Sequence, residues 1–348
     1  VTPQVAGTVV AVLAEETEAV KAGQILVRLD PADARVALDR AEAGLAQTVR
    51  EVQALFLNNS ALAAQVRLRE AELARAQTEV LRSADNLARR QPLIASGAIG
   101  TEEIDHAQSA LAAARSAQAA ALSALAAAQE QAASNRALTD GTTVERHPSV
   151  ERAAVAVREA WLALKRSDLP APVSGQIARR SVQVGQRVAA GHALMTVIPL
   201  DQIWIEANFK ESQLERLRIG QRVSLRADLY GTATEFEGRI AGLGAGTGSA
   251  FALLPAQNAS GNWIKIVQRV PVRIELDPAQ LRAHPLRVGL SMHVSVDVSQ
   301  SGGTPLGEAP VVRAASHTGV FDDDLAQVDP RIKAIIAKSL SRAPGAER

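Results

Sequence analysis

Cysteine is absent from the 348-residue chain, and aromatic residues make up only 3% of it. Without cysteine the chain forms no disulfide, no thiolate metal site and no cysteine nucleophile. Aromatic side chains normally supply much of the buried area of a globular core, so their scarcity argues against one large core. The hydrophobic share is nevertheless 47%, and Ala and Val supply most of it. Because Ala has the highest helix propensity, this composition favours long helices.

Charge of one sign and long apolar runs are also lacking. The net charge is +1, which argues against a nucleic-acid partner, because such proteins usually present a basic face. No apolar run approaches the ~20 residues that span a bilayer. The chain opens at Val1 in a strand-like pattern without a signal peptide, so we expect any membrane anchor to lie upstream.

Motifs that carry chemistry are missing as well. Residues 242–248 are rich in glycine, but they match neither a dinucleotide-binding fingerprint nor a P-loop. The histidines are scattered without paired spacing, at His106, His147, His192, His284, His293 and His317. We therefore predict no catalytic residue, no metal site and no cofactor, and hence a protein that is not an enzyme.

Two segments of the chain repeat the same pattern. Residues 5–31 align without a gap on residues 173–199, and such a repeat can decide a fold. In each copy a glycine opens a short strand, and a second glycine precedes an apolar strand that ends at proline. The matched positions are Val5/Val173, Gly7/Gly175, Val20/Val188, Gly23/Gly191, Leu26/Leu194 and Pro31/Pro199. Since glycine accepts a positive φ, we predict that Gly7, Gly23, Gly175 and Gly191 serve the turns of the repeat.

Neither copy of the repeat is large enough to close a hydrophobic core, so we predict that the two pack together as a flattened β-sandwich. The copies resemble the halves of biotinyl and lipoyl domains. In carrier proteins of that type, a hairpin joining the halves presents the lysine that receives the cofactor. Here residues 32–172 separate the halves, and Lys21 is matched by Ala189. We therefore predict a lipoyl-like domain without a cofactor, divided between residues 1–31 and 169–200.

The segment between the two copies has the pattern of a long coiled coil. Residues seven apart from Leu38 to Leu87 are apolar with one exception, and heptads sustained over this length indicate a coiled coil. These positions are Leu38, Leu45, Val52, Asn59, Val66, Leu73, Val80 and Leu87. At the rise of an α-helix, the arm from Ala32 to Leu87 is about 85 Å long.

A break at about residues 90–101 turns the chain back. Pro92 and Gly97 interrupt the heptads, and Thr101, followed by two acidic residues, predicts a helix start with Thr101 as N-cap. The return arm carries mainly Ala and Leu at heptad spacing, at Ile104, Ala107, Leu111, Ala114, Ala121, Leu125, Ala128 and Ala132. We predict an antiparallel helical hairpin over residues 32–168.

Both arms are irregular at a similar height. The first arm carries Asn58-Asn59-Ser60, and the return arm is interrupted by Asp140-Gly141 and His147-Pro148. Two interpretations stay open: a joint or offset in the hairpin, or an Asn that fixes the register beside an unrelated loop. Helix is predicted again from Ser149 to about Arg166.

Beyond residue 200 the pattern changes to alternating apolar and polar residues. Short strands with turn signals predict a small antiparallel β-barrel over residues 201–300. The expected strands are 203–208, 221–226, 235–241, 264–276 and 290–298, with a short helical piece at 210–217. Residues 301–348 are predicted to be a mobile tail with one helix near 330–340. The predicted fold is therefore α+β, elongated and multidomain.

This order of half-motif, hairpin, half-motif and barrel resembles the membrane fusion protein (HlyD-like) family of periplasmic adaptors. The likeness covers residues 1–298 and is closest to the multidrug efflux branch of the family. Its most specific stretches are residues 207–211 (ANFKE), 246–258 (GTGSAFALLPAQN) and 261–269 (GNWIKIVQR).

The resemblance implies a non-catalytic subunit of a tripartite multidrug efflux pump. Such an adaptor lies in the periplasm of a Gram-negative bacterium and is held to the inner membrane by an N-terminal helix, which we expect upstream of this chain. The implied partners are a major-facilitator drug:proton antiporter, a TolC-type outer-membrane channel and further copies of the chain, in a ring expected to be hexameric.

The resemblance also implies two contact regions. Family hairpin tips resemble Arg-x3-Leu-x6-Ser, and Gly100 stands at the Ser position, where we expect Thr101 to substitute. The residues expected to contact the channel are Arg89, Arg90, Leu93, Ile99, Gly100 and Thr101. Those expected to face the transporter or the substrate path lie in a barrel loop and are Phe251, Leu253, Leu254, Gln257, Asn258 and Trp263.

Three other functions compete with this interpretation. The same architecture would serve as the adaptor of an ABC-type (type I) protein secretion system. A lipoyl or biotinyl carrier subunit would need a modified lysine. A purely structural coiled-coil scaffold would leave the split repeat without a purpose.

Overall fold

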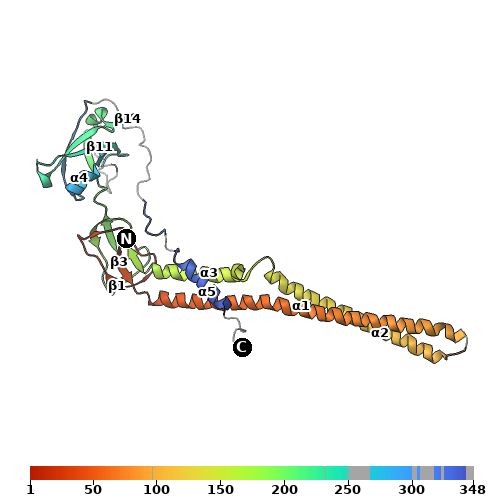
Figure 1. Ribbon diagram of the computed structural model, residues 1–348. Coiled ribbons are helices and arrows are strands. Elements are labelled where there is room, and N and C mark those ends of the chain that lie inside the picture. Colours follow the sequence, from red (N-terminus) through yellow and green to blue (C-terminus); the bar gives the residue numbers. More distant parts are fainter. Residues whose placement is uncertain are drawn as a thin grey trace, which may run out of the picture. The chain divides into compact units, whose positions relative to one another are not determined.

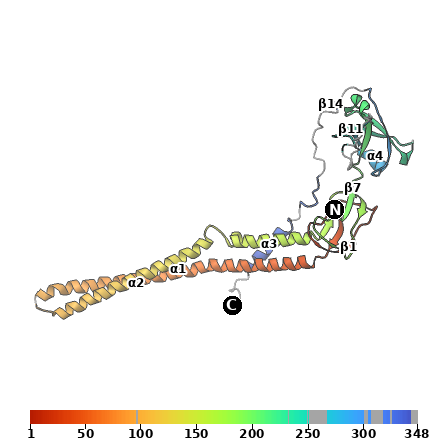
Figure 2. The ribbon, with the colours of Figure 1, turned by 180° about the vertical axis from the view of Figure 1, so that it is seen from behind.

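The computed structural model describes residues 1–95, 97–231, 233–248, 250, 267–299, 304–305, 317–322 and 325–341. The chain forms two compact units, residues 1–30 with 166–322 and residues 31–165 with 323–348. The first unit holds both copies of the repeat and the strands that follow them. The second unit holds the helical hairpin (Figure 1, Figure 2).

The repeat forms short strands in two antiparallel sheets. The first copy supplies β1 (Gly7–Val12), β2 (Ala19–Val20) and β3 (Ile25–Leu29). The second copy supplies β5 (Gly175–Arg180), β6 (Arg187–Val188) and β7 (Met195–Ile198), and β4 (Asp168–Pro170) precedes it. The strand orders are β4-β3-β1-β6 and β2-β5-β7. Each sheet therefore contains strands from both copies, which confirms the predicted sandwich of two halves.

Equivalent residues of the two copies pair with equivalent partners in the other copy. Gly7 of β1 lies opposite Val188 of β6, and the matching Gly175 of β5 lies opposite Val20 of β2. Strands β1 and β5 also carry a β-bulge at the same repeat position. A bulge bends a strand and increases its twist, so both strands bend at matching places. The two copies therefore share the strand pairing and the strand curvature as well as the sequence pattern.

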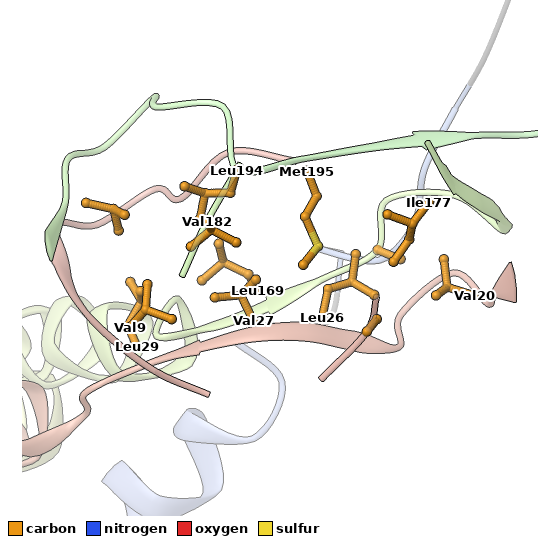
Figure 3. Packing of buried hydrophobic residues seen from close by; sticks show 13 residues of the cluster. Val9, Val20, Leu26, Val27, Leu29, Leu169, Ile177, Val182, Leu194 and Met195 are labelled. Carbon is orange, nitrogen blue, oxygen red and sulfur yellow. The ribbon is translucent and has the colours of Figure 1, made fainter. Parts of the chain in front are cut away.

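The apolar core of this domain is built from matched residues of the two copies. Figure 3 shows their side chains pointing toward one another from β-strands of both halves. The matched pairs in the core are Val9/Ile177, Val20/Val188, Leu26/Leu194 and Val27/Met195, each with at most 4% of its surface exposed. Because each pair contributes one residue from either end of a long insertion, the core forms only when both copies are present.

The glycines of the repeat meet two different requirements. Gly23 and Gly191 have φ angles of 81° and 82°, as predicted for tight turns. Gly7 and Gly175 differ from the expected turn role, because they begin strands β1 and β5. At Gly175 the requirement is space, since a Cβ there would lie 2.3 Å from the carbonyl oxygen of Ile198.

A five-stranded antiparallel sheet follows the repeat. Its strands are β8 (Trp204–Lys210), β10 (Arg222–Ala227), β11 (Phe236–Leu243), β12 (Arg269–Leu276) and β13 (Met292–Val296), in the order β13-β10-β11-β12-β8. The sheet curls into a nearly closed barrel around Leu225, Phe236, Ile240 and Ile274, each at most 1% exposed. Between and after these strands lie η2 (Glu211–Arg216), β9 (Arg218–Ile219), η3 (Asp228–Tyr230), α4 (Pro278–Ala283) and β14 (Thr304–Pro305).

The second unit is an antiparallel helical hairpin (Figure 1). Its outgoing arm is the single helix α1 (Ala32–Ala95), 64 residues long. The return arm consists of α2 (Thr101–Thr139), the short η1 (Val144–Arg146) and α3 (Pro148–Lys165). The predicted seam is buried along much of the hairpin, at Leu38, Leu45, Val52, Ile104, Ala107, Leu111, Ala114, Leu125 and Ala128.

Both ends of the hairpin start from adjacent strands. Strand β3 leads into α1, and β4 follows α3. The two strands pair antiparallel, the amide of Leu29 donates to the carbonyl of Ser167 at 2.8 Å, and Arg28 forms an ion pair with Asp168 at 2.7 Å. The sheet therefore holds the two chain ends side by side, which is the spacing that an antiparallel helix pair needs.

The helix expected near residues 330–340 is α5 (Val328–Ser341). It packs against α1 and α3 and buries Val328, Ile332 and Ile336 with them. This part of the chain thus differs from the mobile tail expected from composition. The reason is that its apolar residues recur every four positions and form one face, which finds an apolar surface on the hairpin.

We predict that Gly175→Ala lowers the free energy of unfolding by about 1–3 kcal/mol, because the added methyl group overpacks the contact between β5 and β7. Gly44→Ala is the control, since a Cβ there meets nothing within 4 Å. In the interior of α1 that change should raise stability by up to about 1 kcal/mol. Urea denaturation of the two variants checks both values, and equal stability of Gly175→Ala and the parent chain would contradict the packing argument.

Candidate functional site

The tip of the hairpin is a short loop closed by backbone hydrogen bonds. Helix α1 continues through Pro92 to Ala95, so it ends inside the predicted range of about 90–101 but after the proline. Helix α1 thus ends two residues before Gly97, whose amide donates to the carbonyl of Ile94 at 2.9 Å. Gly97 has a φ of 73°, which suits the left-handed residue that commonly ends a helix.

The return arm begins one residue earlier than an N-cap at Thr101 would place it. Gly100 is the N-cap of α2, with φ −80° and ψ 161°, and no side chain caps this end. Thr101 is therefore the first helical residue and stays exposed. Two acidic residues, Glu102 and Glu103, lie in the first turn, where they interact favourably with the helix dipole.

The tip presents apolar side chains to solvent between charges of both signs. Leu93 and Ile94 are 42% and 40% exposed. Arg89 is exposed and Arg90 half-buried on the same end of α1, and neither forms an ion pair with another described residue. All six predicted tip residues lie at the end of α1, in the loop or in the first turn of α2, with Ile99 half-buried and Gly100 exposed. This arrangement suits docking of a protein surface and holds no catalytic group.

The barrel loop predicted to face the transporter lies outside the described residues. That holds for Phe251, Leu253, Leu254, Gln257, Asn258 and Trp263. In the part of the chain that is described, no group of three His, Asp or Glu side chains could hold a metal ion.

A second functional feature of the hairpin is a polar cluster inside its seam. Asn59 Nδ2 donates to Thr139 Oγ1 at 2.7 Å, and Asn135 Nδ2 donates to Asn59 Oδ1 at 2.9 Å. Asn135 also receives a bond from Asn58 at 3.2 Å and donates to the carbonyl of Leu55 at 3.1 Å. A buried polar network is favourable only when its members are paired, so this cluster fixes one register between α1 and α2.

The cluster lies immediately before the break in the return arm. Helix α2 ends at Thr139, a member of the cluster, while α1 passes the same height without interruption. The two interpretations of Asn59 therefore apply together: it fixes the register, and the return arm is offset next to it. Sequence reasoning missed Asn135 and Thr139, although both continue the heptad positions of Ala128 and Ala132.

His147 joins the two pieces of the return arm. Its Nδ1 accepts a hydrogen bond from the amide of Ser149 at 3.2 Å, so it caps the start of α3. Its Nε2 lies 3.1 Å from the carbonyl of Leu138 at the end of α2. These two bonds together suit the neutral imidazole that carries its proton on Nε2. A histidine that sequence reasoning treated as structural thus links α2 to α3.

Helix α2 is long and apolar enough, by length and composition alone, to cross a membrane. Its most apolar window owes this to Ala, so the expectation that no apolar stretch is long enough to span a bilayer does not hold for this helix by length and composition. The Ala residues at heptad spacing pack against α1. Only 11% of that window is buried, so packing against α1 accounts for the alanines on the seam and not for those on the outer face.

Comparison with protein families identifies two domains. Residues 32–167 match the EMRA alpha-helical hairpin domain, and residues 202–297 match the AAEA-like beta-barrel domain. The two matches together cover the hairpin and the barrel.

Individual relatives extend the match over nearly the whole chain. The fatty acid resistance protein FarA of Neisseria gonorrhoeae is 45% identical over 339 residues, which is 97% of this chain and 82% of FarA. The multidrug export protein EmrA of Escherichia coli K12 is 44% identical over 303 residues, 87% of this chain and 74% of EmrA. Among solved structures, the periplasmic adaptor protein EmrA matches with a TM-score of 0.37 at 18% identity, over 85% of this chain and 93% of that one.

We predict that Asn135→Ala lowers the free energy of unfolding of the hairpin by about 1–3 kcal/mol, because Asn58 loses its acceptor and Asn59 Oδ1 loses its donor, while only the bond from Asn59 to Thr139 stays. Thermal unfolding followed by circular dichroism measures the effect. Ser123→Ala on the same helix is the control, since Ser123 is exposed and bonds only to the carbonyl of Ala119. A variant as stable as the parent chain would show that the cluster does not fix the register.

Proposed function

The chain belongs to the EmrA-like membrane fusion proteins, a family of non-enzymatic efflux adaptors, and on that premise we propose that it couples an inner-membrane major-facilitator transporter to a TolC-type outer-membrane channel. The observation that carries the proposal is the hairpin inserted between two halves of one lipoyl-like domain. This arrangement holds the tip far from the base of the hairpin, because a helix as long as α1 spans about 95 Å. We further propose that the adaptor lies in the periplasm, held to the inner membrane by a helix outside this chain.

The hairpin tip is the proposed contact with the channel. Its exposed Leu93 and Ile94 offer apolar area to bury, and the arginines and acidic residues around them offer polar contacts at the rim. Interfaces commonly combine an apolar centre with a charged rim. The proposed contact residues are Arg89, Arg90, Leu93, Ile99, Gly100 and Thr101.

The lipoyl-like domain and the barrel complete the proposed assembly. We assign the lipoyl-like domain to a ring of copies, of which six is the expected number. Exposed apolar side chains on this domain support that role, at Val10, Leu13 and Val184. The barrel loop from Phe251 to Trp263 is assigned to the transporter or to the substrate path.

The second candidate is an adaptor of an ABC-type protein exporter, which would use the same architecture. The similarity to a multidrug export protein and to a fatty acid resistance protein favours small amphiphilic substrates over proteins. A carrier subunit is disfavoured because Lys21 lies in a turn of the first half, without a lysine at the matched Ala189.

The experiment that tests the proposal compares deletion strains. The gene for this chain, the adjacent transporter gene and both together are removed, and susceptibility to lipophilic drugs, uncouplers and fatty acids is measured. Equal hypersensitivity of the three strains is the expected result, because an adaptor and its transporter act in one pathway. Unchanged susceptibility together with a lost secreted protein would favour the exporter instead.

We predict that Leu93→Asp abolishes resistance without lowering the protein level. Loss of a buried leucine at an interface costs about 1.5–3 kcal/mol, and a buried carboxylate adds a desolvation cost. Leu81→Asp is the matched control, because Leu81 lies on the same helix, is 68% exposed and is outside the tip. Resistance is measured as the minimal inhibitory concentration, with immunoblots for protein level; normal resistance of Leu93→Asp would remove the tip from the proposed interface.

A further inference from the structure

The base of the hairpin carries an apolar surface that is completed by the C-terminal helix. On α1 the surface is formed by Leu38, Leu45, Val49 and Val52, and on α3 by Val150, Ala154 and Val157, all at most 5% exposed. The same cluster contains Val328, Ile332 and Ile336 of α5, at 0%, 4% and 8% exposure. Both views show α5 beside α1 and α3 (Figure 1, Figure 2).

Two ion pairs of opposite polarity fix the direction of α5 on this surface. Asp329 at its start accepts a hydrogen bond from Arg158 Nε of α3 at 2.8 Å. Arg331, two residues further along, faces Glu42 of α1, with Nη2 donating to Oε2 at 3.0 Å and Nε against Oε1. Glu42 is only 19% exposed, so this forked pair is better shielded from solvent than an ordinary surface pair.

The Arg331 pair is reinforced by its surroundings. The hydrogen bond to Glu42 raises the pKa of the Arg331 guanidinium above its ordinary value. The guanidinium carbon also lies 5.9 Å from the ring centre of Trp161 on α3. One residue of α5 thus contacts both arms of the hairpin, so a change of its charge should disturb both contacts.

Helix α3 depends on neighbours because it is short and isolated. It has 18 residues and is separated from α2 by the interruption at residues 140–147. Isolated helices of this length are marginal in water and gain their stability from packing. Three of its side chains are fully buried, and all three lie in the cluster shared with α1 and α5.

Movement at the base of the hairpin is amplified at its tip. The arm from Asn59 to Ala95 is about 55 Å long at the rise of an α-helix. A tilt of about 10° at the interruption would therefore move the tip by about 10 Å, which is a helix diameter. To contact its partner, the tip must be positioned with a smaller error than this displacement.

We propose that the α1–α3 face at the base of the hairpin is a docking surface for α5 of the same chain, and that α5 acts as a brace. Docked, it completes a three-helix bundle that holds α3 on α1 and keeps the interruption in the return arm from bending. In this proposal α5 stays docked on α1 and α3 throughout transport. Its effect on resistance rests on the proposed function, whereas its effect on the hairpin does not.

Charge exchange tests the brace in the whole chain. Arg331→Glu should speed amide hydrogen exchange in α5 and α3 about tenfold, because local opening becomes easier. Glu42→Arg should act alike, and the double variant should restore protection because the pair is formed with its signs exchanged. Arg69→Glu on α1 is the control. It breaks an exposed ion pair with Glu72 of α1, at a place away from α5. Unchanged exchange in α3 when α5 is released would overturn the proposal.

A cross-link tests which copy supplies the helix. The chain has no cysteine, so Arg158→Cys with Asp329→Cys introduces a single pair of thiols at two positions whose native side chains meet, and a short reducible bis-maleimide can bridge them. Cross-linking should give an internally linked monomer that keeps full resistance. A covalent dimer would show that a neighbouring copy supplies α5, and lost resistance that returns on reduction would show that α5 must leave; either result overturns the brace as stated.

Resistance assays complete the test and separate it from the proposed function. Arg331→Glu should lower resistance toward that of the deletion strain, and the double variant should recover it. Faster exchange without any loss of resistance would reject the role of the brace in transport. If the deletion strain itself is as resistant as the parent, the proposed function fails, while hydrogen exchange and cross-linking still decide whether α5 braces the hairpin.

Discussion

The interleaving of the two repeat copies is the constraint on which the rest of the structure depends. Neither copy closes a sheet or a core alone, because β1 needs β6 and β2 needs β5. Residues 32–172 must therefore leave and return to one small domain. The pairing of β3 with β4 sets the two crossing points side by side, so the insertion can only be a structure whose ends meet, and a two-helix hairpin is the simplest of these.

The hairpin has to be long, and its two arms have to pair in one register. Different residues meet these two requirements. Alanine along the seam of α2 allows close approach, but a uniform apolar seam would tolerate sliding of one arm along the other. The cluster of Asn59, Asn135 and Thr139 removes that freedom, since a slip leaves polar groups unpaired. It lies just before the interruption of the return arm, where sliding would otherwise start.

Much of the fold and part of the candidate site could be predicted from local pattern. The split repeat, the heptads and the alternating strands after residue 200 each have a period that belongs to one kind of structure. The errors fell where a local signal competed with its context. Pro92 interrupts the heptads, yet α1 continues through it to Ala95, and Asn135 is a polar residue within a seam that is otherwise rich in alanine.

The sequence by itself determined the order of the parts, the length of the hairpin, the position of its tip and the family resemblance, because these depend on periodicity and on turn residues close together in the chain. Only the tertiary structure decided which strands of the two copies pair, that Gly175 is needed for space and not for φ, and that α5 packs on α1 and α3. The pairing of the two copies and the packing of α5 depend on contacts between residues more than a hundred positions apart, and the space at Gly175 depends on the pairing of β5 with β7. A local sequence pattern does not record which surfaces come into contact.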